Sequence, residues 1–207
     1  MEKHLVICIG RQFGSGGREI GLGLAKKLGI RFYDKEILKK AAEESGIVEE
    51  LFEKADEKPT NSFLYSLSMG THGQAMNFTN YNDYLTNDKL FLFQSNTIRD
   101  MAEKDSCVII GRCADYILRG RKDMLSVFIH APMELRIQRI SRVRNVEEDA
   151  ARSLIKKTDR QRANYYNFYT NKKWDALQNY DLTLDSSIFS PEQAVELIMQ
   201  AAGFIGK

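Results

Sequence analysis

A glycine-rich segment near the start of the chain has the residue types of a phosphate-binding loop. It spans residues 10–19 with the sequence GRQFGSGGRE. Glycines let backbone N–H groups approach an anion closely, and a helix that follows them adds the positive end of its dipole. The phosphate-loop pattern GxxxxGK[ST] is matched in part, since Gly17 fits its second glycine. Its first glycine, lysine and hydroxyl residue are replaced by Gln12, Arg18 and Glu19. The alternative is an ordinary glycine-rich turn.

Two arginines stand where a cation opposes a helix dipole. Arg18 falls in the first turn of the helix expected after the loop, and Arg112 follows the apolar run Cys107–Ile110 at another expected helix start. A cation there costs about 0.3 to 1 kcal/mol unless an anion lies nearby, although Glu19 offsets part of this for Arg18. We therefore expect both arginines to face a ligand at the carboxyl edge of a sheet, where open α/β sheets bind ligands. The alternative for Arg112 is a surface salt bridge.

Residues 136–162 form a basic stretch, with seven arginines and two lysines against four acidic residues. Arg139 and Arg142 share a helix face, so their guanidinium groups can close over phosphates. For Arg136 and Arg144 we expect instead a solvated face paired with nearby acids. The whole chain carries a formal charge of only +2, and the stretch has interspersed acids and no RNA-binding motif. We therefore expect no nucleic-acid partner.

The elements that position these residues follow from short apolar runs. Continuous runs of this length predict strands buried on both faces of a parallel sheet. The five predicted strands are Leu5–Ile9, Ile30–Tyr33, Cys107–Ile110, Leu125–Ile129 and Leu182–Leu184. Helical patterns alternate with them, and the last helix opens with a capping box at Ser190 and Gln193. This order predicts a three-layer α/β fold with a five-stranded parallel sheet.

Composition restricts the protein class. The chain has 207 residues, 43% of them hydrophobic, which is typical of a globular protein. No apolar run approaches the ~20 residues of a membrane-spanning helix, so we expect no membrane contact and a cytoplasmic location. Three cysteines without a CxxC pair argue against a disulfide framework and a zinc site. Residues 36–105 are helical at both ends, and their middle, 70–88, is rich in Asn and Tyr and has the character of an insertion.

Several segments together resemble the cytidylate kinase-like family, relatives of bacterial CMP kinases. The segments are FGSGGRE, LGIRFYDKE, IIGRCAD, FIHAPMELRIQRI, TDRQRANYYNFYTNKKW and YDLTLDSS. The resemblance implies a P-loop kinase fold that makes up a single domain, 1–207. Within it, 36–105 is an acceptor-binding insertion and 139–162 a basic lid region. The implied reaction transfers the γ-phosphoryl group of ATP to CMP or dCMP with Mg²⁺.

The resemblance also implies roles for individual residues. Arg18 takes the place of the lysine that bridges the β- and γ-phosphates, Arg112 matches the arginine of a G-R-D segment at the acceptor site, and Asp159 matches an acidic acceptor residue. Asp34 resembles the aspartate that begins the acceptor site, with a helix cap as its alternative. The residues implied for ATP binding are Gly14, Ser15, Gly16, Gly17, Arg18 and Glu19.

Charge stabilisation during transfer is expected from arginines, since phosphoryl transfer depends mainly on cations around the moving group. The candidates are Arg18, Arg139, Arg142, Arg160 and Arg162. For Mg²⁺ we expect Ser15 or Glu19, with Asp34 and Asp115 as alternatives. Two other functions remain open: a kinase for another small acceptor, and a catalytically silent module that senses nucleotide. The sequence makes no prediction of the oligomeric state.

Overall fold

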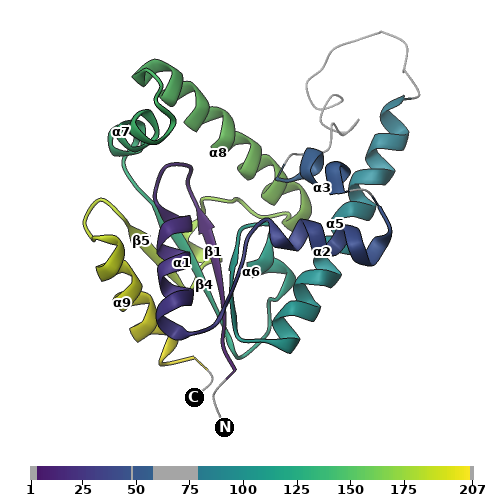
Figure 1. Cartoon of the computed structure of the whole chain (residues 1–207), viewed down its shortest axis with the longest axis horizontal. Helices are drawn as coiled ribbons and strands as arrows, with labels where there is room; N and C mark the ends of the chain where they lie inside the picture. Colours follow the sequence, from purple (N-terminus) through teal and green to yellow (C-terminus); the bar gives the residue numbers. More distant parts are fainter. Residues whose placement is uncertain (1–3, 48, 58–78, 206–207) are drawn as a thin grey trace.

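The computed structural model describes residues 4–47, 49–57 and 79–205, and its centre is a five-stranded sheet (Figure 1). All neighbouring strands are parallel, in the order β2-β3-β1-β4-β5. The strands are β1 (Val6–Arg11), β2 (Arg31–Tyr33), β3 (Cys107–Ile110), β4 (Met124–His130) and β5 (Leu182–Asp185). The predicted α/β fold is therefore confirmed. The bounds of four strands differ from the prediction by one or two residues, and the largest difference is at β1, which continues beyond Ile9 because Gly10 and Arg11 still pair with β4.

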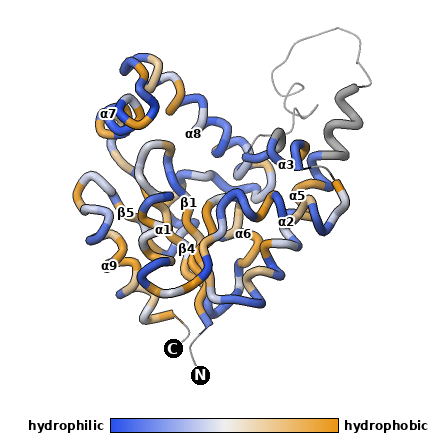
Figure 2. The backbone as a smooth tube through the Cα atoms, in the orientation of Figure 1, coloured by the Kyte–Doolittle hydropathy of each residue, from blue (hydrophilic) through white to orange (hydrophobic). Residues whose placement is uncertain are grey.

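The sheet separates two hydrophobic clusters. Along β1, Val6 and Cys8 lie in one cluster, whereas Ile7 and Ile9 lie in the other. This follows from the strand geometry, in which successive side chains point to opposite faces. Because both faces are covered, every residue of β1 is buried. Figure 2 shows hydrophobic residues concentrated in the strands and in α9, while α8 is largely hydrophilic.

Helices cover both faces of the sheet (Figure 1). They are α1 (Gly17–Leu28), α2 (Glu36–Ser45), α3 (Glu49–Ala55), α5 (Thr79–Lys104), α6 (Ala114–Ile117), α7 (Met133–Arg144), α8 (Glu148–Thr170) and α9 (Pro191–Ala202), with a 3-10 turn at Leu177–Asn179. Helices α1 and α9 pack on one face, and α5, α6 and the end of α8 pack on the other. The predicted capping box at the start of α9 is present. None of the described helices has the length and apolar content that a membrane crossing requires.

Two smaller clusters lie beside the carboxyl edge of the sheet. One joins α2, α3 and α5 through Leu38, Phe52 and Leu90. The other joins α7 and α8 through Ile137 and Ile155, with Phe13 of the glycine loop packed against it. Figure 1 shows these two groups of helices on opposite sides of the loop that follows β1. Residues 58–78, which include 70–78 of the Asn- and Tyr-rich middle of the predicted insertion, lie outside the described residues, whereas the rest of that middle, 79–88, forms the start of α5.

Candidate active site

The segment between β1 and α1 forms a tight loop that depends on two glycines. Gly14 and Gly16 have φ angles of 84° and 82°, in the left-handed region that glycine adopts at little cost. A Cβ atom on Gly16 would also overlap the guanidinium of Arg139. Gly16 is the N-cap of α1, so the N–H groups of the first helical turn, which have no carbonyl partner within the helix, point out at the end of the loop. This geometry suits an anion.

Asp159 and Arg136 hold the loop from the side of α7 and α8. The Oδ1 atom of Asp159 accepts a hydrogen bond from the Phe13 N–H at 2.7 Å, and Oδ2 pairs with Arg136. Arg136 also donates to the Phe13 carbonyl at 3.3 Å. Arg136 is only 5% exposed, so its predicted place on a solvated face is wrong. The reason is helical spacing, because Arg136 lies one turn before Ile140 on the face that packs against α8.

Ser15 is buried within the loop and is fixed by hydrogen bonds. Its hydroxyl donates to the Gln12 carbonyl at 2.8 Å, and its own carbonyl accepts from the Ser186 hydroxyl at 2.6 Å. Ser186 follows directly after β5, so the loop is fastened to the opposite side of the sheet as well. These contacts order the loop before any ligand binds.

Of the five arginines expected around the transferring group, the four other than Arg18 lie in different environments. Arg139 lies over the loop, where its Nη1 atom donates to Glu19 at 3.3 Å. Arg162 lies in a buried cluster described below. Arg142 and Arg160 are exposed and form no ion pair with any residue that the structure describes. The structure thus brings only Arg139 and Arg162 of this set close to the loop.

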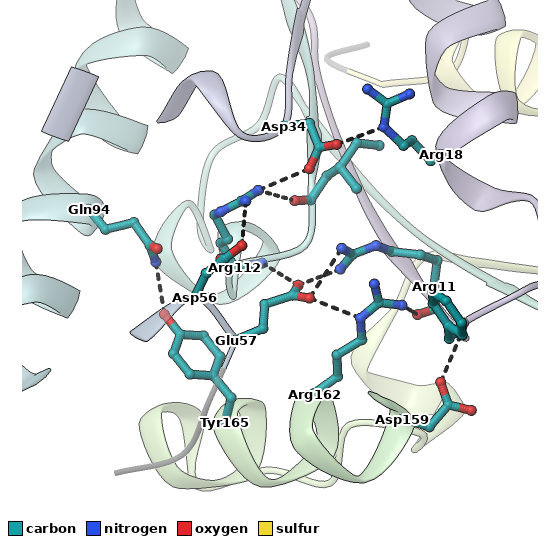
Figure 3. Close-up of polar contacts among 12 residues, drawn as sticks. Arg11, Arg18, Asp34, Asp56, Glu57, Gln94, Arg112, Asp159, Arg162 and Tyr165 are labelled. Atoms are coloured by element: carbon teal, nitrogen blue, oxygen red, sulfur yellow. Dashed lines mark hydrogen bonds and ion pairs between the residues drawn. The ribbon is translucent and has the colours of Figure 1, made fainter. Parts of the chain in front are cut away.

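Asp34 links the two arginines singled out by their positions. Its Oδ2 atom pairs with Nε of Arg18 at 2.8 Å, and its Oδ1 atom pairs with Nη1 of Arg112 at 3.2 Å (Figure 3). Burial raises the pKa of the Asp34 carboxyl, but the hydrogen bond from Arg18 and the charge of Arg112 outweigh burial and hold that pKa below its ordinary value. The helix-cap alternative for Asp34 is wrong, since the N-cap of α2 is Lys35.

Arg112 lies in a left-handed turn and not in a helix. Its φ angle is 55°, and α6 begins two residues later with Cys113 as N-cap, so the predicted helix start at Arg112 is wrong. The side chain of Arg112 is 2% exposed, which excludes a surface salt bridge. Its Nη2 atom pairs with Asp56 at 3.0 Å, and its Nη1 atom also donates to the Ile110 carbonyl at 3.3 Å.

Glu57 is the centre of a second buried group, which the sequence did not indicate. The Arg11 guanidinium makes two hydrogen bonds to the Glu57 carboxylate, and Nε of Arg162 makes a third at 2.9 Å (Figure 3). Burial raises the pKa of Glu57, but the charges of Arg11 and Arg162 outweigh burial and hold this pKa far below its ordinary value. Glu57 is therefore ionised at neutral pH despite its burial.

Two buried polar atoms at this site have no hydrogen-bond partner within the described part of the chain. They are Nε of Arg112 and Oδ1 of Asp56. Burial raises the pKa of Asp56 above its ordinary value in spite of the nearby Arg112. Buried polar groups in native proteins are almost always hydrogen-bonded, so these atoms favour contact with a ligand or water.

An aromatic pocket adjoins Asp56 between α3, α5 and α8. Its polar contact is a buried hydrogen bond of 2.9 Å from the Gln94 amide to the Tyr165 hydroxyl (Figure 3). The rings of Phe91 and Tyr169 stack at a centroid distance of 3.8 Å along another wall. The pocket thus places aromatic faces and an amide next to Asp56, which pairs with Arg112.

The oxygen atoms beside the loop fit a magnesium ion that arrives with phosphates. Mg²⁺ in such sites keeps several waters and takes one or two protein oxygens in addition to phosphate. Glu19 offers such an oxygen on a side chain that is 66% exposed and accepts one hydrogen bond from Arg139, whereas the Ser15 hydroxyl is buried and donates to the Gln12 carbonyl. The alternatives are less free, since Asp34 is paired with two arginines and Asp115 accepts a hydrogen bond from Tyr166 at 2.7 Å. Among the described residues, no group of three or more His, Cys, Asp or Glu side chains is placed to hold a metal by itself.

Comparison with protein families gives a match over most of the chain. The model of a family described as the cytidylate kinase-like family matches residues 6–188. The chain belongs to this family. Membership in this family supports a phosphotransferase that uses a nucleotide.

Two similar proteins are both named cytidylate kinase. The protein from Methanopyrus kandleri is 24% identical over 206 residues, which cover 95% of this chain and 92% of that protein. The protein from Methanocaldococcus jannaschii is 30% identical over 105 residues, which cover 49% of this chain and 58% of that protein. The latter match therefore spans little more than half the length of its relative.

Solved structures agree with the fold. An uncharacterized protein from Eubacterium ventriosum has a TM-score of 0.71 and 28% identity, with 97% of this chain and 99% of that one covered. A shikimate kinase from Bacteroides thetaiotaomicron has a TM-score of 0.53 and 15% identity over 97% and 99% of the two chains. At that identity the second likeness concerns the fold alone.

Proposed function

We propose that the chain transfers the γ-phosphoryl group of ATP to a nucleoside monophosphate, with CMP and dCMP as the first acceptors to test. The observation that carries this proposal is the placement of two anion-binding groups at one sheet edge. The glycine loop follows β1, Arg112 follows β3, and these strands are neighbours in the sheet. A phosphate donor on the loop and a phosphorylated acceptor at Arg112 would therefore lie side by side. Membership in the cytidylate kinase-like family favours this acceptor class.

On the donor side, the loop supplies hydrogen bonds and a helix dipole. The backbone N–H groups of 14–17 and the start of α1 would bind the β- and γ-phosphates. Arg18, whose side chain is 63% exposed, can leave Asp34 and reach the phosphates as a planar fork in place of a lysine. A magnesium ion, bound with help from Ser15 or Glu19, would neutralise phosphate charge.

Arginines on the lid side would stabilise the charge that spreads over the transferring group. Arg139 is already over the loop, and Arg162 lies against Arg11 at the end of β1. Arg142 and Arg160 would join them when the lid region 139–162 closes over bound nucleotide. Since the moving group needs cations more than covalent partners, these positions suit the reaction.

On the acceptor side, Arg112 would bind the acceptor phosphate and Asp34 would orient Arg112. We assign the acceptor to the region 36–105, within one kinase domain that spans 1–207. Asp159, by contrast, uses both carboxylate oxygens to hold Phe13 and Arg136. These contacts favour a role for Asp159 in ordering the loop, while its predicted role in acceptor binding stays a prediction.

The engagement of Asp159 favours a second candidate: a kinase for a small acceptor other than CMP. A panel of acceptors separates the two. We would measure ADP release from ATP and Mg²⁺ with each nucleoside monophosphate, each deoxy form, and small phosphorylated or hydroxylated metabolites. Release that depends on CMP or dCMP supports the first proposal, and release with another small acceptor supports the second. No release with any acceptor contradicts both, and ATP binding without turnover would then favour a silent sensing module.

Two variants test the site assignment in the same assay. Arg18→Ala should mainly lower kcat, because Arg18 is assigned to the transferring phosphate. Arg112→Ala should mainly raise KM for the acceptor. Arg99→Ala, which removes an exposed arginine on α5 whose guanidinium donates a hydrogen bond to Asn96, is the matched control. Normal kinetics in both site variants would remove the assignment.

A further inference from the structure

The carboxylate of Glu57 is surrounded by three arginines, two at or after the ends of sheet strands and one on α8. We name Arg11 at the end of β1, Arg112 after β3 and Arg162 on α8 the arginine cage. Arg11 Nη2 lies 3.2 Å from Glu57 Oε2, Arg162 Nε lies 2.9 Å from the same oxygen, and the backbone N–H of Arg112 approaches Oε1 at 3.5 Å (Figure 3). The carboxylate thus takes the contacts that an anionic ligand would take in such a cage.

Positive charge exceeds negative charge immediately around the Glu57 carboxylate. Arg11 and Arg162 carry two positive charges and both pair with the single carboxylate of Glu57, whereas the Arg112 guanidinium pairs with Asp34 and Asp56. This excess of positive charge acts on the arginines themselves, since burial and the charge of Arg11 lower the pKa of Arg162. Arg112 Nε is also buried and has no hydrogen-bond partner among the described residues, and the whole residue is only 2% exposed. The cage therefore has the charge and the donors for an anion stronger than one carboxylate.

Glu57 is the member of the group that is easiest to displace. The three arginines belong to two central strand ends and to a long helix, whereas Glu57 lies just beyond the short helix α3. Its backbone has a φ angle of 49°, in the left-handed region that non-glycine residues rarely adopt. Such a conformation persists only where surrounding contacts hold it, and here the contacts come from the arginines. Without the contacts to the arginines, the backbone at Glu57 would be free to leave this conformation.

Gly111 makes room for this arrangement. It has a φ angle of 68°, and a Cβ atom there would overlap both the Arg11 guanidinium and the Glu57 carboxylate. The backbone between β3 and Arg112 is therefore shaped so that an anion can approach it closely. The loop after β3 thus forms a built site, and Glu57 fills it.

We propose that Glu57 is an internal ligand of the acceptor's anion site and determines which acceptors can bind. A phosphate monoester dianion, with two charges and three oxygens, displaces the Glu57 carboxylate from the arginine cage. A carboxylate or a neutral acceptor gains too little to do so. The identity of the anion as an acceptor phosphate rests on the proposed function, whereas the competition between Glu57 and anions does not.

The test measures anion binding with inorganic phosphate and acetate as probes. We would titrate the full chain with each probe by calorimetry at pH 7.5, using the wild type, Glu57→Gln and the control Glu53→Gln, an exposed glutamate on α3. We expect Glu57→Gln to bind phosphate about 10- to 100-fold more tightly, the factor expected where the free site is populated in about 1–10% of wild-type molecules. We also expect acetate to bind Glu57→Gln and not the wild type. Glu53→Gln should match the wild type.

Equal phosphate affinity in the wild type and Glu57→Gln would overturn the proposal, as would absence of phosphate binding in both. If Glu57→Gln does not fold, Glu57→Asp is the second variant, because it keeps the charge on a shorter side chain. A phosphate affinity of Glu57→Asp above that of the wild type supports competition between Glu57 and phosphate. An unchanged affinity contradicts it. The outcome is separate from that of the kinase assay. Tighter phosphate binding without any acceptor-dependent ADP release would refute the proposed function and leave the anion site in place.

Discussion

Removal of the Arg112 side chain should affect both the stability of the fold and the binding of the acceptor. Arg112 is 2% exposed and pairs with Asp34 at 3.2 Å and Asp56 at 3.0 Å. The change Arg112→Ala leaves two buried carboxylates short of a partner. Breaking a buried pair in this way costs about 3–5 kcal/mol. Asp34 keeps Arg18, and the raised pKa of Asp56 makes its protonation easier, so we expect about 3 kcal/mol, the low end of the range.

Two assays report this effect. For a urea dependence of about 2 kcal/mol/M, a loss of about 3 kcal/mol lowers the unfolding midpoint by about 1.5 M at pH 7. In the kinase assay, loss of hydrogen bonds to a charged group, about 1.5–3 kcal/mol, corresponds to a fall of roughly 10- to 150-fold in kcat/KM, expressed mainly in KM for the acceptor.

The exposed Arg99 provides the control, because Arg99→Ala should change stability by less than about 0.5 kcal/mol. The double variant with Asp34→Asn should lose less than the sum of the two single changes, since the two side chains are in contact. A cost below about 1 kcal/mol for Arg112→Ala, or additive single changes, would refute the reasoning from the buried ion pairs.

Three further predictions concern stability and reactivity. Because the pKa values of Asp34 and Glu57 are depressed in the folded chain, the unfolded chain binds protons at acid pH that the folded chain does not. The free energy of unfolding should therefore fall as pH drops from about 6 to 3. The slope should be smaller in Glu57→Gln, and an unchanged slope would contradict this. Ser190→Ala removes the capping box of α9 and should cost about 1 kcal/mol in thermal unfolding, whereas no cost would mean that the cap is dispensable. Burial raises the pKa of all three thiols, to about 12 for Cys107. A thiol reagent at pH 8 should therefore react with the cysteines only after the protein unfolds. Rapid reaction of the native protein would contradict their buried positions.

The fold was predictable because its signals are local. Continuous apolar runs such as Cys107–Ile110 identified the buried strands, and the capping box at Ser190 identified the start of the last helix. The predicted end of β1 at Ile9 is wrong, because Gly10 pairs with Phe128 of β4 and continues the strand. In the sequence alone, a glycine inside a strand cannot be distinguished from a glycine that ends one.

Site residues could be predicted only where the position of a residue within one helix or strand indicates its role. Arg18 and Arg112 stood out because each occupies the start of an expected helix, and the structure joins them through Asp34. Arg136 could have been recognised from its spacing to Ile140 on an apolar face.

The Arg11–Glu57–Arg162 cluster had no comparable signal. Its members come from a strand end, the residue beyond a short helix and a distant helix, up to 151 positions apart for Arg11 and Arg162. Such contacts are set by the packing of α3 and α8 against the sheet edge. No pattern within one element encodes them.

The most direct test of the donor site is a calorimetric titration of ATP with Mg²⁺ into the wild type, Gly16→Ala and the control Gly29→Ala. Both glycines have positive φ, 82° and 67°, so both variants bear similar backbone strain. At Gly16 the added Cβ would take the place of the Arg139 guanidinium and displace this side chain from the loop, while nothing lies within 4 Å at Gly29. We predict that the wild type and Gly29→Ala bind ATP with similar affinity and that Gly16→Ala binds it more weakly. Absence of binding in the wild type, or equal binding in all three, would contradict a phosphate site at this loop.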